Sequence, residues 1–309
     1  MAIALITGKK LLVMFILLMI GIAVSKVGLV KGEGKAQLSD ILLMLVSPMV
    51  IISSYQTKYD AHLAANLLDS FLLATIGFAV VIIFSSLFIR KNNSEYSIER
   101  INVIYSNGGF IGIPLVGAVL GKEGVFYLTA YLTMFNILLW THGVILMTGK
   151  ASIKTTIKNI CTPSIFATIF GIGAFLTGFT LPELIAEPVQ MISDLNTPLA
   201  MIVAGATLAE TNIIECLKNI RIYYLTILKL IVMPLIVCAA FSKIPIDGMV
   251  KMVILIATAC PAGASGTMFA LRYKKNSRYA SQLFAFTTIL SVTTLPVMVL
   301  LMMRILHID

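Results

Sequence analysis

The sequence NVIYSNGGFIGIPLVGAVLG, residues 102–121, decides the fold, because it is apolar enough to cross a membrane and yet poorly suited to a continuous helix. Its middle holds Asn107, the glycine pair Gly108 and Gly109, and Pro114. Glycine lowers helix propensity, and proline lacks a backbone donor and clashes with the preceding turn. The pattern predicts a helix that breaks near the centre of the bilayer.

A second stretch repeats this pattern about 155 residues later. It reads MVILIATACPAGASGTMFALRY, residues 252–273, with Pro261 and Gly263 at the corresponding depth. Backbone groups without partners in hydrocarbon carry a penalty of several kcal/mol each, so broken helices are found where they line a protein cavity or a bound solute. Two such breaks at matching depths predict a binding site.

The chemistry of a helix break indicates the kind of ligand. Half-helix N-termini present free N–H groups and a partial positive charge, so an anion is the expected guest. The alternative is that glycine and proline here serve only packing or kinks, as they often do in membrane helices. Gly117 and Gly121 have the GxxxG spacing of such packing residues.

The composition places this chain in a membrane. Of its 309 residues, 59% are hydrophobic and 12% are charged, and the mean hydropathy is +0.98, whereas soluble proteins keep about a quarter of their residues charged. This excludes a disordered chain, a secreted disulfide scaffold and a nucleic-acid-binding module. The cysteines and histidines have no metal-ligand spacing, no phosphate-binding GxxxxGK[ST] motif is present, and we expect no cofactor.

Windows of about 20 apolar residues, the length that crosses the hydrocarbon layer, recur along the chain. They predict an all-α polytopic membrane protein with ten transmembrane helices. The predicted spans cover residues 11–30, 38–56, 67–89, 101–120, 125–148, 162–181, 189–209, 222–242, 250–271 and 279–306.

The net charge of +9 is interpreted as a topology signal, with binding to lipid headgroups as the alternative. Most Lys and Arg residues fall in one set of alternate loops, which the positive-inside rule places in the cytoplasm. Both termini are therefore predicted outside the cytoplasm, although Lys9 and Lys10 oppose this orientation.

The second half of the chain follows the first at an offset of about 150 to 155 residues. Residues 1–150 and 151–309 are predicted to form two five-helix repeats, with breaks in spans 4 and 9. Because five is an odd number, the halves enter the membrane from opposite sides, which is the inverted-repeat architecture of secondary transporters.

The stretches SNGGFIGIPL and ACPAGASGTMFALRYKKNSRYASQLFAFTTILSVTTLP resemble the auxin efflux carrier family, which includes plant auxin exporters and bacterial permeases for malate and related acids. The resemblance implies a scaffold of spans 1, 2, 6 and 7, often dimeric, and a mobile transport domain of spans 3–5 and 8–10. It also implies that substrate binds where spans 4 and 9 cross. Ser106 and Ala262 depart from the plant pattern, and this weakens any assignment of auxin as the ligand.

The resemblance and the polar residues within spans together give the predicted site. Asn107 matches an asparagine that hydrogen-bonds a substrate carboxylate, Pro114 matches the proline of a Gly-Ile-Pro turn, and Pro261 matches the proline of the second crossover segment. Asn136 and Ser291 lie on flanking helices, where bonds within the helix bundle would also explain them. The predicted substrate-binding residues are Asn107, Gly108, Gly109, Pro114, Asn136, Pro261, Gly263 and Ser291.

Two charged residues inside spans are candidates for energy coupling. Asp69 lies in span 3, and Lys229 lies in span 8, where it is placed to neutralise a substrate carboxylate or to pair with Asp69. The alternatives are that Asp69 lies among interfacial waters and that Lys229 extends its charged end toward the membrane surface.

The sequence therefore predicts a non-enzymatic secondary carrier of the plasma membrane that moves a small organic anion, such as malate, by alternating access. One alternative is a sodium-coupled organic-anion symporter of the bile-acid type. Another is a membrane sensor without transport activity.

Overall fold

The computed structural model describes residues 2–91, 93–150, 160–211 and 213–308, and every named element in these ranges is a helix. The first half contains α1 (Ala2–Lys26), α2 (Gly32–Ile41), η1 (Leu42–Val46), α3 (Ser47–Ser54), α4 (Ala61–Phe88), α5 (Tyr96–Ile104), η2 (Gly108–Gly112), α6 (Ile113–Leu138), η3 (Leu139–Gly143) and α7 (Val144–Thr148). The second half contains α9 (Pro163–Thr177), α10 (Glu183–Asp194), α11 (Asn196–Ala209), α12 (Ile213–Lys218), α13 (Ile220–Ile227), η4 (Leu228–Val232), α14 (Met233–Phe241), α15 (Gly248–Ala259), α16 (Ser265–Arg272) and α17 (Ser277–Leu306).

The helices have the lengths that a membrane requires. Within the described residues, six helical segments are long and apolar enough to cross a bilayer: Gly32–Ser54, Ala61–Phe88, Gly108–Thr148, Glu183–Ala209, Ile220–Phe241 and Ser277–Leu306. Shorter apolar helices cover Leu12–Lys26, Pro163–Thr177 and Gly248–Ala259. The all-helical polytopic class is therefore confirmed, while ten crossings in an inverted repeat stay a prediction.

Short π-helical turns interrupt several of these helices, and three of them have a common cause. η1, η2 and η4 each end two residues before a proline, at Pro48, Pro114 and Pro234. A proline ring clashes with the carbonyl four residues earlier, so the helix widens just before it. Wide turns of this kind are frequent at functional sites, and η2 and η4 both reach the site described below.

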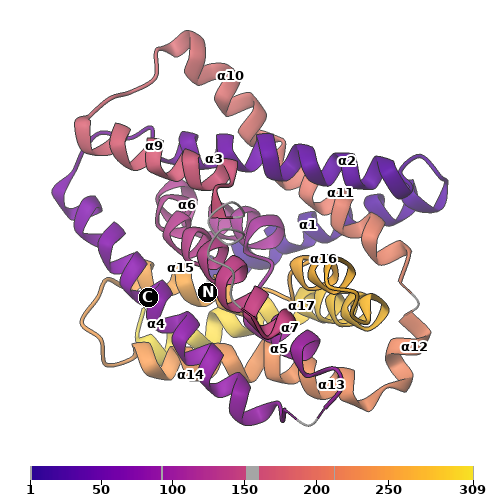
Figure 1. The fold of residues 1–309 in the computed structure, drawn as a ribbon. Helices are drawn as coiled ribbons and strands as arrows, with labels where there is room; N and C mark the ends of the chain where they lie inside the picture. The colour runs from indigo at the N-terminus through magenta and orange to yellow at the C-terminus, as the bar shows by residue number, and fades with distance from the viewer. Residues whose placement is uncertain (1, 92, 151–159, 212, 309) are drawn as a thin grey trace.

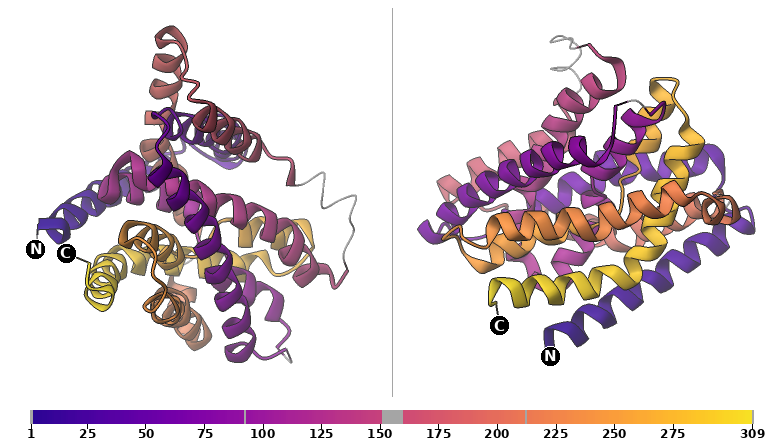
Figure 2. Two further views of the ribbon diagram at one scale, coloured as in Figure 1. Left: turned by 90° about the vertical axis from the view of Figure 1, so that its left-hand side faces the viewer. Right: turned by 90° about the horizontal axis from the view of Figure 1, so that it is seen from below.

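The helices pack as two groups (Figure 1). In the first group α1 packs along α11, and α3 packs against α9 and α10. In the second, α6 packs against α4 and α15, and α16 packs against α17. Two further views show α4, the continuous rod of α13, η4 and α14, and α17 on one side of the molecule, with both chain ends lying near each other (Figure 2).

The two groups meet through α1, α6, α11 and α17, and aromatic side chains pack where α6 meets α3 and α9. The Tyr55 hydroxyl, just after α3, hydrogen-bonds the Thr129 hydroxyl of α6 at 2.7 Å and is completely buried. Phe126 packs edge-on against Tyr55 and Phe175 at ring-centroid distances of 4.9 and 5.1 Å. Close aromatic packing therefore closes one end of the contact between the groups.

The prediction that Gly121 is a helix-packing residue is wrong. Gly121 has φ +71° and ψ −164°, which is not helical, and a β-carbon there would meet nothing within 4 Å. Glycine adopts this conformation without steric penalty. Gly121 therefore forms the turn at which the fourth predicted span ends and the fifth begins.

Candidate functional site

The two stretches with clustered glycine and proline are interrupted helices that lie against each other. α5 ends at Ile104 and η2 begins at Gly108, while α15 ends at Ala259 and α16 begins at Ser265. Each helix is therefore broken where its sequence predicts.

The chain between the helix ends is extended, and the two extended pieces bond to each other. Ser106 and Ala262 form an isolated antiparallel bridge. The Asn107 N–H donates to the Pro261 carbonyl at 2.8 Å, and the Gly263 N–H donates to the Tyr105 carbonyl at 2.9 Å. Each break thus satisfies part of the backbone that the other leaves open, which hydrocarbon surroundings demand. We call the paired segments Tyr105–Gly109 and Cys260–Ser265 the crossover.

Glycine is required at one side of the crossover by lack of space. A β-carbon on Gly263 would lie 2.8 Å from Ser265 Oγ and 3.2 Å from the Tyr105 carbonyl oxygen. Gly109 differs, because it is half-buried and a β-carbon at this position would have no other atom within 4 Å. Gly108 is intermediate, at 3.2 Å from Leu132. Open space at the crossover therefore lies beside Gly109.

Asn107 carries an unused donor at this point. Its side-chain oxygen accepts from the Phe110 N–H at 3.2 Å, and its carbonyl accepts from Ile111 and Gly112 at 3.1 and 3.0 Å. The side-chain nitrogen has no partner, although Asn107 is only 5% exposed. Within the described ranges the Gly109 N–H also donates no hydrogen bond. Buried donors normally find partners, so these two are suited to a ligand with acceptor atoms.

Lys229 brings a positive charge to the crossover. It is 1% exposed on η4, and its ammonium group donates to Ser106 Oγ and to the Thr258 carbonyl, the latter at 3.3 Å. No carboxylate among the described residues forms an ion pair with it. The ion pair with Asp69, one of the two roles predicted for Lys229, is absent. Asp69 is half-buried on α4, while the amine is held at the crossover by its two acceptors.

The flanking residues are placed differently from Asn107. The Asn136 side-chain nitrogen donates to the Leu132 carbonyl of its own helix at 2.9 Å, and Ser291 Oγ donates to the Thr288 carbonyl at 2.7 Å. Pro114 is buried in the first turn of α6. The structure therefore places Asn107, Gly108, Gly109, Pro261 and Gly263 at the crossover, and it leaves Asn136 bonded within α6.

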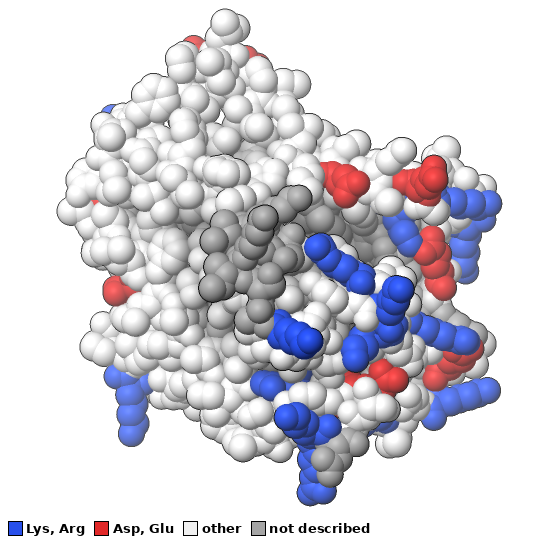
Figure 3. Space-filling view, in the orientation of Figure 1, with Lys and Arg blue, Asp and Glu red and all other residues white. Residues whose placement is uncertain are grey.

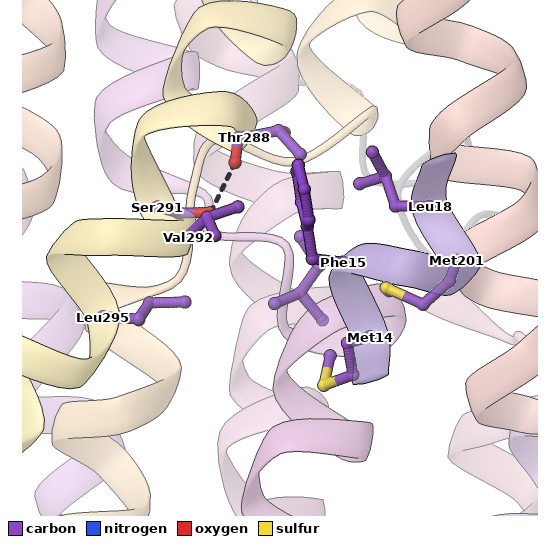
Figure 4. Close-up of a pocket in the computed structure, with 9 residues that line it drawn as sticks. Met14, Phe15, Leu18, Met201, Thr288, Ser291, Val292 and Leu295 are labelled. Atoms are coloured by element: carbon purple, nitrogen blue, oxygen red, sulfur yellow. Dashed lines mark hydrogen bonds between the residues drawn. The ribbon is translucent and has the colours of Figure 1, made fainter. Parts of the chain in front are cut away.

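Ser291 does line a small cavity beside the crossover. The cavity measures about 30 Å³ and lies between α1, α11, α17 and Ile111 of η2. Figure 4 shows Met14 and Phe15 projecting from α1 toward Ser291 and Val292 of α17. The walls are apolar apart from Thr288 and Ser291. This cavity therefore suits an apolar part of a ligand better than a charged part.

Two contributors to this site were missed from the sequence. Thr287 on α17 accepts the Ala262 N–H at 3.2 Å and so fixes the second break. Ser106 connects the first break to Lys229. Ser106 lies directly before Asn107 in the predicted break, which is a signal for it, whereas no comparable signal marks Thr287.

The chain is similar to known membrane proteins. The chain matches the membrane transport protein family over residues 7–152 and 147–299. It is 28% identical over 152 residues to auxin efflux carrier component 8 of Arabidopsis thaliana, in an alignment that covers 48% of this chain and 41% of that protein. The plant protein is thus matched over less than half of its length.

The family matches take in both interrupted segments and nearly all of the helices that pack around them. Members of this family are transporters and not enzymes, which agrees with a buried crossover between apolar helices. The chain is therefore a multi-pass membrane protein that belongs to the membrane transport protein family, the family of the auxin efflux carriers.

Proposed function

We propose that this protein is a secondary carrier that moves a small organic anion across the plasma membrane by alternating access. The observation that carries the proposal is the buried crossover, where Asn107 and Gly109 hold unused donors and Lys229 holds a charge without a carboxylate partner. A carboxylate would accept from both donors and neutralise the lysine. Charge-assisted hydrogen bonds of this kind are stronger than neutral ones.

The proposed architecture is ten crossings in two inverted five-helix halves, residues 1–150 and 151–309. α1–α3 with α9–α11 would be the scaffold, and α4–α7 with α13–α17 the transport domain. The division follows the two packing groups, which share few contacts outside α1, α6, α11 and α17. Motion of the transport domain past the scaffold would carry the crossover from one side of the bilayer to the other.

The proposed orientation follows the basic residues. Figure 3 shows Lys and Arg gathered toward one end of the visible face, on the side where α2, α12 and α16 lie in Figure 1. The positive-inside rule makes this end cytoplasmic and both chain ends extracytoplasmic. The opposite end is closed by Tyr55, Phe126 and Phe175, so we infer that the structure corresponds to a state closed to the outside.

The substrate class follows from the chemistry of the crossover. Its donors select a carboxylate or a similar anion, and malate is one candidate. The apolar cavity beside Ser291 favours a substrate that also carries a hydrocarbon part. A panel of labelled monocarboxylates and dicarboxylates in proteoliposome counterflow tests this proposal and ranks the substrates.

Asn107→Ala and Asn136→Ala form a matched pair for that assay. Both remove an amide from the second packing group, but only Asn107 has a donor without a partner. We expect Asn107→Ala to lower exchange at least about tenfold, because one charge-assisted hydrogen bond contributes about 1.5 to 3 kcal/mol, and Asn136→Ala to stay near wild type. Equal exchange by Asn107→Ala and wild type for every accepted substrate would show that the site is assigned wrongly.

We also propose that Asp69 and Lys229 couple transport to an ion gradient. A buried ammonium group at the crossover repels a second cation there, which disfavours the sodium-coupled alternative. Asp69→Asn should abolish uptake driven by a proton gradient and leave counterflow intact. Uptake that requires sodium and ignores the proton gradient would favour the bile-acid type of symport instead.

A further inference from the structure

A second, larger cavity opens between the two packing groups near the end that is rich in Lys and Arg. It measures about 410 Å³ and is lined almost entirely by polar and charged side chains, in contrast to the apolar cavity beside Ser291. Its lining residues come from the end of α11, from α12, from α16 and from the start of α17: Glu210, Thr211, Glu215, Thr267, Ser277, Arg278, Ser281 and Gln282.

This cavity reaches one turn of helix from the crossover. Thr267 lines it and lies in the first turn of α16, the helix that begins directly after the second break. The hydroxyls of Thr267 and Ser265 are buried without hydrogen-bond partners, and Ser265 lies against Gly263. The lining therefore runs from polar groups near the surface to the unused hydroxyl of Thr267, two residues from Ser265 of the crossover.

The guanidinium of Arg278 already holds a carboxylate in this cavity. Its Nε donates to Glu215 Oε2 at 3.1 Å, its second nitrogen pairs with Glu215 Oε1, and Gln282 Nε2 donates to Glu215 Oε2 at 3.1 Å. Two parallel bonds of this kind are the geometry by which arginine recognises any carboxylate. Glu215 occupies the position that a substrate carboxylate would take.

The exposure of the Arg278–Glu215 ion pair favours replacement of Glu215 by another carboxylate. The Arg278 side chain is 73% exposed and that of Glu215 is 34% exposed. Exposed ion pairs contribute little to stability, about 0 to 1 kcal/mol, so release of Glu215 from Arg278 carries only a small penalty. The other acidic residue of the cavity, Glu210, is paired with Lys35 of α2 and repels an anion less for that reason.

We propose that this cavity is a capture site for carboxylates on their way to the crossover, with Arg278 as the binding residue and Glu215 as its resident competitor. The proposal rests on the proposed carrier function and adds a second site to it. Glu215 belongs to α12, which joins α11 of the first group to α13 of the second, and Thr211 hydrogen-bonds Ser281 at 3.1 Å beside it. Capture of substrate would therefore also break the bond between Glu215 of α12 and Arg278 of α17.

The test uses malonate, a small dicarboxylate, and the full-length protein in lipid nanodiscs. The midpoint of thermal unfolding is measured against malonate concentration at constant ionic strength, since a ligand raises it according to its affinity. The variants are Arg278→Gln, Glu215→Gln and, as a control, Lys275→Gln, which removes a charge from the connection just before α17, outside the cavity. Each variant is measured alone and in combination with Asn107→Ala, so that binding at the crossover is separated from binding at Arg278.

The two cavity variants should change the apparent dissociation constant in opposite directions. We expect a rise of about fivefold for Arg278→Gln and a fall of about threefold for Glu215→Gln, because the second frees the guanidinium from its competitor. Lys275→Gln should stay within about twofold of wild type. A merely structural ion pair would give the same direction in both variants.

Absence of a malonate-dependent shift in all variants overturns the capture site, and so do equal changes in Arg278→Gln and Lys275→Gln. These outcomes are distinct from failure of the carrier function, which counterflow with labelled carboxylates reports in the same preparation. A carrier that exchanges anions with no change in Arg278→Gln would keep its function and lose this site.

Discussion

The two halves of the crossover hydrogen-bond to each other through their backbones, but different groups hold the chain at each break. At the first break the Asn107 side chain caps η2 and still has a free nitrogen. At the second break no side chain caps α16, and the chain is held by the Gly263 N–H and by Thr287. The first break therefore provides donors for a ligand, while the second provides a closely packed support.

The difference between the breaks has a mechanical consequence. A ligand can approach Gly109, where space is open, and cannot approach Gly263, which is packed against Ser265 and Tyr105. Substitutions at the first break should therefore affect transport, and substitutions at the second should affect stability. Lys229 contacts Ser106 of the first break and Thr258 just before the second. Substitution of Lys229 therefore tests whether the two breaks contribute to one anion-binding site.

The largest expected effect is that of Lys229→Met. Loss of the only charge found at the crossover among the described residues should lower anion exchange at least about 100-fold, or about 2.7 kcal/mol. Stability should be unchanged or higher, because a buried charge without a partner carries a desolvation penalty. Counterflow and the thermal midpoint in nanodiscs measure the two effects.

Lys251→Met on α15 is the control for this substitution, since it removes a lysine of the same group at a half-buried position away from the crossover. Its exchange rate should resemble that of wild type. If Lys229→Met also kept the wild-type rate, the contact between the two breaks would support the fold and would not form an anion-binding site.

The glycines of the two breaks should respond differently to a single methyl group. Gly263→Ala would place a β-carbon 2.8 Å from Ser265 Oγ, and such overpacking carries a penalty of about 1 to 3 kcal/mol. Gly109→Ala meets nothing within 4 Å and should fold normally, with an altered affinity for substrate. Thermal unfolding compares the variants. Equal losses of stability would show that the second break is no more tightly packed than the first.

The sequence predicts the positions of both breaks, because glycine and proline act locally on the backbone that carries them. It also predicts the all-helical membrane class, which depends on composition. The role of Asn136 is less predictable: an amide within a helix can turn back to its own carbonyl, as Asn136 does, and only the fold decides between this and an external partner.

Long-range contacts at the site could not be read from the sequence. Lys229 and Ser106 are 123 residues apart, and their contact depends on how η4 packs beside the crossover. The role of Gly121 could not be predicted from the sequence either. Its GxxxG spacing is typical of packing residues, and only its positive φ identifies a turn.

The smallest effect is expected for Thr287→Val, which tests the support at the second break. Thr287 Oγ1 accepts the buried Ala262 N–H, and valine would leave that donor without a partner at about 1 to 2 kcal/mol. The adjacent Thr288 is equally buried, but its hydroxyl bonds only to the Phe284 carbonyl of its own helix. Thr288→Val should therefore have almost no effect on the unfolding midpoint. Equal midpoints for the two variants would mean that Thr287 does not hold the second break, which would then depend on the bond between Gly263 and Tyr105 alone.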